Sequence, residues 1–363
     1  MILGIPKEMN DRRVAFAPAT LAKAVKELGV EAWVETGAGT AASFPDTSYQ
    51  ETAKVVSRAE LLKNADIIVS INPLPESEWK SLKKDAVVIS RFESFIKPEV
   101  VGKLQDAGLR GFGLDMIPRT TLAQSMDVLS SMASIAGYKA VLEATHYLPR
   151  YFPMLITAAG SVKPSTILIL GAGVAGLQAV ATAKRLGAIV EASDTRLAAK
   201  EEVESLGGRF VMVEGAKDDT SAGGYAVEQS EDFLKRQREE VQNRAAKADV
   251  IITTAQVRGR KAPMLLPAET VNKMKPGSVI IDLAASTGGN CELTKDGEVI
   301  VHNGVTIVGN SDLSQDLPQD ASFLFGNNVL NYMKLFVKKG ELQIDESNEI
   351  ISKSFITATT VTA

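Results

Sequence analysis

The sequence is almost without cysteine. Its 363 residues include a single one, Cys291. One cysteine excludes a disulfide within the chain and favours a reducing, cytoplasm-like compartment. Cys291 lies in the segment GGNCELT, which does not resemble a pairing of a nucleophile with its base. We therefore predict a small buried side chain there and not a nucleophile.

Histidine is nearly absent as well, which limits the chemistry open to the chain. An ordinary dehydrogenase removes a proton from its substrate as the hydride leaves, and histidine is the usual base. Of the two histidines, His146 ends a predicted helix and His302 lies in a predicted hairpin or strand edge. Both are better explained as structural or exposed, which leaves Asp and Glu as candidate bases. The sequence contains neither a cluster of metal ligands nor a serine nucleophile elbow.

A strong net charge and long hydrophobic runs are also lacking. The formal net charge of −4 and pI near 5.5 argue against nucleic acid or an anionic membrane as the main partner. The longest apolar stretch, residues 166–183, approaches the length of a membrane span, but glycines and Gln178 interrupt it. It divides more naturally into a strand and a helix. The N-terminal apolar segment is too short for a signal peptide and predicts a first strand.

Short apolar runs instead alternate with helical patterns. With 45% hydrophobic and 23% charged residues, the composition is that of a soluble globular protein, and the length favours two domains. The first strands are expected at residues 2–6, 31–35, 66–71, 86–90 and 111–116. The helices between them are expected at 21–29, 58–65 and 99–108. This alternation predicts an α/β fold with a parallel sheet covered by helices.

A second series of strands begins near residue 165. Its candidates are nearly all apolar, as expected for strands buried on both faces: TILILGAG, AIVEASD, GRFVMV, DVIITTA, SVIIDLA and VTIVG. A long helix over about 122–149 would join the two series, and the tail after residue 310 should return to the first domain. We predict two Rossmann-like domains, each a mostly parallel sheet flanked by helices. The first would comprise residues 1–128 and 312–363, and the second residues 129–311.

The strongest local motif is the three-glycine sequence Gly171-x-Gly173-x-x-Gly176, between a predicted strand and a predicted helix. Gly171 would allow a tight turn, Gly173 the approach of a diphosphate, and Gly176 close packing of helix on strand. The diphosphate would lie on unpaired amides at the helix N-terminus. The next strand ends in Asp194, which could accept hydrogen bonds from a ribose diol and would repel a 2′-phosphate. NAD(H) is therefore expected in preference to NADP(H).

The neighbours of these residues complete the expected nucleotide site. Arg196 leaves some room for a 2′-phosphate, although an arginine there more often lies over adenine or faces solvent. The candidate cofactor-binding residues read from this region are Gly171, Ala172, Gly173, Val174, Ala175, Gly176, Asp194, Thr195 and Arg196. A polar loop followed by a charged helix occupies residues 214–247, and its composition fits a functional loop or a solvated surface loop equally.

The segment RTTLAQSMDVLSSMA, residues 119–133, combines two helical patterns. A core-like stripe is formed by Leu122, Met126, Leu129 and Met132. A polar face recurs every three residues in Gln124, Asp127 and Ser130, with Arg119 just upstream. Taken alone, such a polar triplet is more simply explained as a solvated face.

Several motifs together resemble the alanine dehydrogenase/transhydrogenase family over nearly the whole chain. They are IPKE…RRVAFAP, AQSMDVLSSMASIAGYKAV, ITAAGSVKPSTILILGAGVAGLQAVATAKRLGA, AGGYA and MKPGSVIIDLA…GGNC. Alanine dehydrogenases of the family carry a substrate-binding Lys, a catalytic His and an Asp at positions where this sequence has Ser70, Arg91 and Ser286. Arg13 matches the family's carboxylate-binding Arg. The resemblance thus favours the other branch, the NAD(H)-binding alpha subunit (domain I) of proton-translocating NAD(P) transhydrogenase.

That branch places polar residues around the nicotinamide. By resemblance, these catalytic candidates are Arg119, Gln124, Asp127 and Ser130. The branch's mobile loop matches AGGYA at 222–226, which adds Gly224 and Tyr225 to the cofactor-binding candidates. A second loop of the branch resembles the TTAQ segment, which adds Ala255 and Gln256. Arg119 and Gln124 could also bridge to the second nucleotide or its protein, and Asp127 could hold Arg119 or accept a carboxamide N–H. The polar face then becomes the wall against which the nicotinamide is set.

Direct hydride transfer between two nicotinamides suits a chain with few histidines. Neither ring releases a proton, so the site needs no general base, only two rings held roughly 3–3.5 Å apart. Only one good dinucleotide fingerprint is present, so NADP(H) is expected from a partner subunit. The chain ends at residue 363 without a hydrophobic tail, so a membrane-spanning subunit is expected to hold the proton channel.

The resemblance implies an enzyme subunit that binds NAD(H) and works with NADP(H)-binding and membrane-spanning partners. A homodimer is expected, without metal or nucleic acid, either peripheral at the cytoplasmic face of the inner membrane or free in the cytoplasm. Two alternatives are an alanine dehydrogenase-like oxidoreductase and a non-catalytic NAD(H)-binding module. NAD-dependent oxidation of L-alanine would favour the first, and NADH binding without hydride transfer the second.

Overall fold

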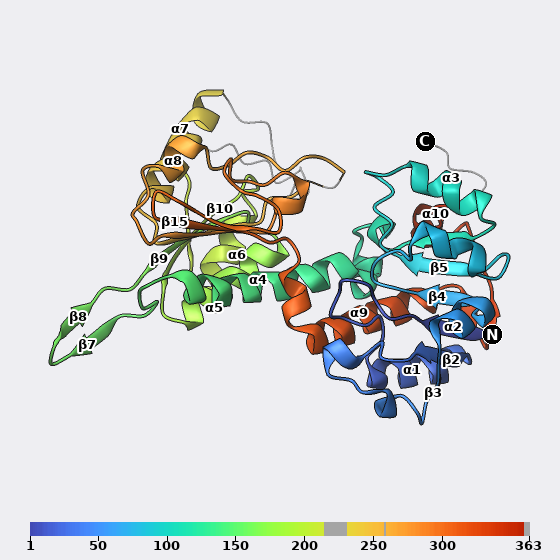
Figure 1. Ribbon diagram of the computed structural model, residues 1–363. Helices are drawn as coiled ribbons and strands as arrows, with labels where there is room; N and C mark the ends of the chain where they lie inside the picture. Colours follow the sequence, from blue (N-terminus) through green and yellow to red (C-terminus); the bar gives the residue numbers. More distant parts are fainter. Residues whose placement is uncertain (214–230, 258, 359–363) are drawn as a thin grey trace. The chain divides into compact units, whose positions relative to one another are not determined.

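The computed structural model describes residues 1–213, 231–257 and 259–358. Gly224 and Tyr225 lie outside the described residues. The chain forms two compact units, Met1–Met132 with Ser314–Ala363, and Ala133–Leu313 (Figure 1). Within the described part, no helix combines the length and the hydrophobicity needed to cross a membrane.

The first unit is built on a six-stranded parallel sheet of order β3-β2-β1-β4-β5-β6. Its strands are β1 Ile2–Ile5, β2 Glu31–Glu35, β3 Ala53–Val56, β4 Ile67–Val69, β5 Val87–Ser90 and β6 Arg110–Gly113. Five of them match the expected strands. The sequence reading missed β3, an edge strand in which only Val56 is buried, so it lacks the apolar run that identifies the others.

Helices cover this sheet, and the tail of the chain belongs to the same unit. They are α1 Pro18–Leu28, α2 Arg58–Asn64, α3 Glu99–Asp106, α9 Pro318–Met333 and α10 Glu349–Ser354. A short hairpin pairs β16 Val337–Lys338 with β17 Glu341–Leu342. In α9, a Cβ atom at Gly326 would lie 2.7 Å from the Thr20 hydroxyl of α1, so the two helices are in close contact.

The helix expected over about 122–149 is in fact two elements. A 3₁₀ helix, η5 Thr121–Met126, ends at Asp127, and α4 Val128–Tyr147 begins directly after it. The expected core stripe is wrong at Leu122, which is 83% exposed, although Met126 and Met132 are buried. The break follows from Asp127, whose Oδ1 accepts the Ser130 N–H at 2.9 Å, as a helix-capping carboxylate does.

The second unit has a seven-stranded sheet of order β11-β10-β9-β12-β13-β15-β14. Its strands are β9 Thr166–Leu170, β10 Ile189–Ser193, β11 Arg209–Phe210, β12 Val250–Thr253, β13 Val279–Asp282, β14 Val299–His302 and β15 Val305–Gly309. All pair in parallel except β14, which forms an antiparallel hairpin with β15 and carries His302 at its end, as expected.

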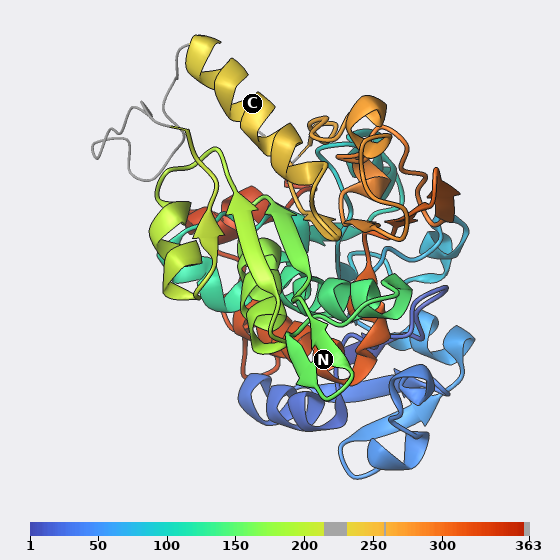
Figure 2. The same cartoon turned by 90° about the vertical axis from the view of Figure 1, so that its left-hand side faces the viewer.

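Helices flank this second sheet, and in Figure 2 α7 is the yellow helix above it. They are α5 Val174–Arg185, α6 Ala199–Ser205, α7 Glu231–Ala245 and α8 Ala268–Val271. A separate hairpin, β7 Leu155–Thr157 and β8 Gly160–Val162, extends away from the sheet (Figure 1). The prediction of two Rossmann-like α/β folds is confirmed.

Candidate functional site

The three glycines form a turn between β9 and α5 in which each has a separate role. Gly171 has φ = 101°, a conformation that favours glycine. A Cβ atom at Gly176 would lie 1.9 Å from the Gly171 carbonyl oxygen, so helix and turn touch there. A Cβ atom at Gly173 would meet no atom of the described part of the chain within 4 Å. The turn therefore leaves open space beside the helix N-terminus, and its residues fit a dinucleotide diphosphate.

The N-terminus of α5 is free to receive an anion. Among the described residues no side chain caps the helix at Gly173, so the amides of its first turn are available to phosphate oxygens. Val174 is half-exposed, whereas Ala172 is buried. The sequence reading missed Gly137 of α4, where a Cβ atom would lie 2.1 Å from the Ala175 carbonyl oxygen. Helix α4 thus braces the start of α5 at backbone contact.

Asp194 follows β10 directly and is tied to the glycine turn. Its Oδ2 accepts the Ala172 N–H at 2.7 Å, and its Oδ1 accepts the Arg196 N–H at 2.8 Å. The Arg196 guanidinium donates to both oxygens, at 3.1 and 3.2 Å, while Thr195 is exposed. These four bonds fill the acceptor capacity of the carboxylate. A ribose diol could bind Asp194 only if the 40% exposed side chain of Arg196 moved aside.

The carboxyl end of β12 contributes the other two cofactor-binding candidates. The Ala255 backbone exchanges two hydrogen bonds with the Asn290 side chain, at 3.0 and 2.9 Å. The Gln256 amide donates to the Leu283 carbonyl at 2.7 Å, so this side chain is already engaged. The chain reverses its direction of travel across the sheet between β9 and β12, and such switch points are where open α/β sheets bind ligands.

Two buried residues that the sequence reading missed organise this edge, Asp282 and Asn290. Asp282 ends β13 and accepts hydrogen bonds from the Thr253 hydroxyl at 2.9 Å and the Asn290 N–H at 2.9 Å. It also accepts the Cys291 N–H at 3.1 Å. Cys291 is buried as predicted, and burial raises the pKa of its thiol, which disfavours the nucleophilic thiolate. An acid at the end of an otherwise apolar strand was the signal that could have identified Asp282.

The four nicotinamide candidates lie in one segment, which runs from just before η5 to the first turn of α4. Arg119 and Gln124 are exposed, and their side chains form no hydrogen bond or ion pair with the residues that the structure describes. Asp127 is partly buried and binds Ser130, with Oδ2 accepting the Ser130 hydroxyl at 2.7 Å. Both carboxylate oxygens of Asp127 therefore serve Ser130 at the start of α4, and within the described residues no bond joins Asp127 to Arg119.

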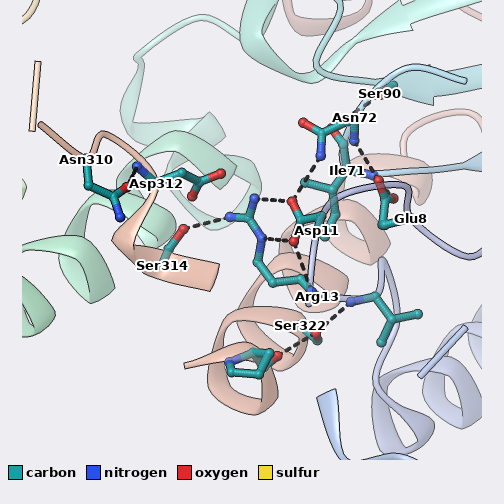
Figure 3. Close-up of polar contacts among 12 residues, drawn as sticks. Glu8, Asp11, Arg13, Ile71, Asn72, Ser90, Asn310, Asp312, Ser314 and Ser322 are labelled. Atoms are coloured by element: carbon teal, nitrogen blue, oxygen red, sulfur yellow. Dashed lines mark hydrogen bonds and ion pairs between the residues drawn. The ribbon is translucent and has the colours of Figure 1, made fainter. Parts of the chain in front are cut away.

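Arg13, which the sequence matched to the family's carboxylate-binding arginine, is almost completely buried (Figure 3). Its Nε and Nη2 donate to the two carboxylate oxygens of Asp11, at 2.9 and 2.5 Å. Its Nη1 donates to the Ser314 hydroxyl at 2.6 Å. The guanidinium is thus held by a carboxylate of its own chain in the bidentate geometry that arginine favours.

A second buried carboxyl, Glu8, lies beside this pair (Figure 3). It accepts the backbone N–H groups of Ile71 at 2.6 Å and Asn72 at 3.2 Å, at the end of β4. Burial raises the pKa of Glu8 to about 7, and the nearby charge of Asp11 acts in the same direction. The neighbouring Ser70 is buried, and its hydroxyl donates to the Ser90 hydroxyl at 3.3 Å. In the second unit, Ser286 is exposed.

The features of the second unit define a class of protein. A parallel sheet, a glycine turn with open space at Gly173, and an acid after the second strand together form a dinucleotide-binding Rossmann unit. Comparison with family models then matches residues 4–136 to the alanine dehydrogenase/PNT N-terminal domain and residues 140–362 to the C-terminal domain. The chain belongs to the alanine dehydrogenase/PNT family.

Relatives from both branches of the family match along most of the chain. It is 42% identical over 357 residues to NAD(P) transhydrogenase subunit alpha of Haemophilus influenzae, covering 97% of this chain and 69% of that one. The crystal structure of a transhydrogenase from Sinorhizobium meliloti superposes with a TM-score of 0.90 at 39% identity, covering 98% and 97%. Alanine dehydrogenase of Bacillus subtilis is 25% identical, covering 99% and 91%. The predicted resemblance to transhydrogenase alpha subunits is confirmed.

Proposed function

We propose that this chain binds NAD(H) in a transhydrogenase and exchanges hydride directly with NADP(H) held by a partner subunit. The observation that carries the proposal is the pair Arg119 and Gln124, an exposed guanidinium and an exposed amide without partners in the described chain. They stand next to Asp127 and Ser130, whose mutual hydrogen bonds fix the start of α4. Such groups orient a carboxamide and do not remove a proton, which suits transfer between two nicotinamides.

Each part of the proposed site has a separate task. Bound NAD(H) would supply the hydride donor or acceptor at its nicotinamide ring. The amides at the start of α5 hold the diphosphate, and Gly173 leaves the space for it. Asp194 binds the adenosine ribose once Arg196 has moved aside. Arg119 and Gln124 orient the carboxamide, so that the reacting carbon is presented to the second ring at near-attack distance.

The proposal extends to an assembly. NADP(H) is supplied by one partner subunit, and hydride transfer is coupled to proton translocation in a membrane-spanning subunit, with this chain peripheral at the cytoplasmic face of the inner membrane. A homodimer is supported by the hairpin β7–β8, where Met154 and Ile156 are 61% and 72% exposed. An isolated two-stranded hairpin is marginally stable in water, so one carrying exposed apolar side chains favours burial against a second copy.

One mixing experiment tests the proposal. The purified chain is combined with the NADP(H)-binding component of the same system, and reduction of an NAD analogue by NADPH is followed by absorbance. We expect rapid analogue reduction that depends on both proteins. NADH binding without any transfer would overturn the proposal in favour of a non-catalytic module, and NAD-dependent oxidation of L-alanine by the chain alone would establish an alanine dehydrogenase.

A further inference from the structure

Two asparagines of α9 converge on a single backbone atom of the nicotinamide-positioning segment. The Nδ2 atoms of Asn328 and Asn331 donate to the Ser125 carbonyl oxygen, at 2.9 and 3.2 Å. Ser125 follows Gln124 directly in η5. We propose that Asn328 and Asn331 are positioning residues, forming a clamp that fixes the backbone on which Gln124 is presented to the nicotinamide. This inference rests on the proposed function and adds residues to it.

Helix α9 is a rigid base for such a clamp. Its 16 residues include Phe325 and Val329, which are fully buried in the first unit. The close approach of Gly326 to the Thr20 hydroxyl fixes the helix against α1. The Ser322 hydroxyl, drawn in Figure 3, accepts the Val14 N–H at 2.9 Å and ties α9 to the loop after β1. Groups held by packed helices set a geometry more tightly than groups on loops do.

The clamped segment has few ties of its own. Helix η5 is a six-residue 3₁₀ helix, and such short helices have poor hydrogen-bond geometry. Within η5, Ala123 and Met126 are buried, whereas Gln124 and Ser125 are exposed. The Ser125 carbonyl lies between these buried contacts, so two amide donors on it restrain the part of the segment that solvent would otherwise loosen.

Asn328 is an unfavourable residue for the stability of the folded chain. Its side chain is buried, and among the described residues its Oδ1 has no hydrogen-bond partner. A buried acceptor without a partner destabilises the folded chain, so an apolar residue of similar size would be tolerated at this position. The donor to Ser125 is the contact that an apolar residue could not provide. If Asn328 positions Ser125, Asn328→Leu should slow hydride transfer without lowering the melting temperature. If Asn328 serves only stability, the variant should lower the melting temperature.

The test compares Asn328→Leu, Asn331→Leu and the double variant with Asn327→Leu as control. Asn327 is half-exposed like Asn331 and lies on the same helix, but its Nδ2 donates to the Phe323 carbonyl within α9. Three quantities are measured: the NADH dissociation constant, the rate of hydride transfer with the NADP(H)-binding component, and amide hydrogen exchange in residues 121–126. Thermal unfolding reports whether each variant folds.

We expect the double variant to lower the transfer rate at least ~10-fold while the NADH dissociation constant changes less than ~3-fold, since ring placement fails before binding. Exchange in residues 121–126 should rise, and Asn328→Leu should not lower the melting temperature. Asn328→Gln, which keeps the amide donor, should recover part of the rate. If the double variant fails to fold, Asn331→Leu carries the same comparison.

Each other outcome overturns a different statement. An unchanged transfer rate, or losses equal to those of Asn327→Leu, would overturn the positioning role alone. Equal losses in binding and transfer, together with a lower melting temperature, would show that the two asparagines have only a structural role. If the wild-type mixture transfers no hydride, the proposed function fails and the positioning role with it. Exchange in residues 121–126 would then still decide whether the two asparagines restrain η5.

Discussion

The carboxylate of Asp194 accepts the backbone N–H of Ala172 at 2.7 Å, which joins the end of β10 to the glycine turn after β9. The same carboxylate binds the guanidinium of Arg196. We therefore predict that substitutions at the two positions affect NADH affinity differently. Asp194→Ala should weaken NADH binding roughly 10-fold or more, because hydrogen bonds to charged groups contribute about 1.5–3 kcal/mol. Arg196→Ala should not weaken it, since it uncovers the acceptor.

Isothermal titration with NADH and NADPH measures both variants, with Asp232→Ala as control. Asp232 is an exposed acid that pairs with Arg236 within α7. Unchanged NADH affinity in Asp194→Ala would refute the ribose contact. A gain in NADPH affinity in that variant would show that the released Arg196 accepts a 2′-phosphate.

Substitutions in the glycine turn should distinguish effects on folding from effects on NADH binding. Gly176→Ala should destabilise the second unit by several kcal/mol, because its Cβ would lie 1.9 Å from a backbone oxygen. Gly173→Ala should leave the melting temperature within a few degrees but weaken NADH binding, because its Cβ enters space that only a ligand would fill. Gly102→Ala in α3, also with open space around it, should be neutral or stabilising by about 0.5–1 kcal/mol. Unchanged NADH affinity in Gly173→Ala would show that the diphosphate does not bind at this turn.

These glycines could be predicted because their roles depend on local backbone geometry. A strand, three glycines and a helix fix the turn from about ten consecutive residues. The break between η5 and α4 could not be predicted from periodicity, because Leu122 fits the apolar spacing of one continuous helix. The break occurs where the Asp127 carboxylate accepts the Ser130 N–H and caps the start of α4. Local hydrogen bonds of Asp compete with helix continuation, and spacing alone does not report which prevails.

Long-range ties explain the rest of what the sequence does not reveal. Ser125 and Asn328 are 203 residues apart, and no pattern in either segment points to the other. The same holds for Arg13 and Ser314, which are 301 residues apart. The acid Asp11 two residues before Arg13 was visible, but its bidentate pairing depends on the loop between β1 and α1. Partner choice in such contacts is a property of the folded chain.

Gln124→Asn tests the nicotinamide site directly. Gln124 is exposed and its side chain has no partner among the described residues, so the substitution should leave the free energy of unfolding unchanged. It withdraws the amide by one methylene, about 1.5 Å, so hydride transfer should slow at least ~10-fold while the NADH dissociation constant changes less than ~3-fold. Stopped-flow transfer rates and NADH titration measure the two quantities. Gln50→Asn is the exposed control, and equal losses in rate and affinity would reject the positioning role of Gln124.

Glu8 should make stability depend on pH. Burial raises its pKa from 4.5 to about 7, so between these values the folded chain holds a proton that the unfolded chain has lost. The unfolding free energy should therefore fall as pH rises from about 4.5 to 7, by about 3 kcal/mol in total. Glu8→Gln cannot ionise, so its loss of stability over this range should be smaller by that amount. Urea unfolding at several pH values measures the difference, with exposed Glu60→Gln as control; parallel curves for wild type and Glu8→Gln would contradict it.

The hairpin β7–β8 predicts where two copies meet. Ile156→Asp places a charge on the most exposed apolar position of the hairpin, and a carboxylate there would lose its hydration on burial in an interface. Sedimentation equilibrium should show the wild type as a dimer of about 77 kDa, twice the chain mass of 38.7 kDa, and the variant as a monomer. Val301→Asp is the matched control, since Val301 is 69% exposed on the edge strand β14 of the same unit. A dimer that survives Ile156→Asp but not Val301→Asp would move the interface to β14, and a monomeric wild type would reject the homodimer.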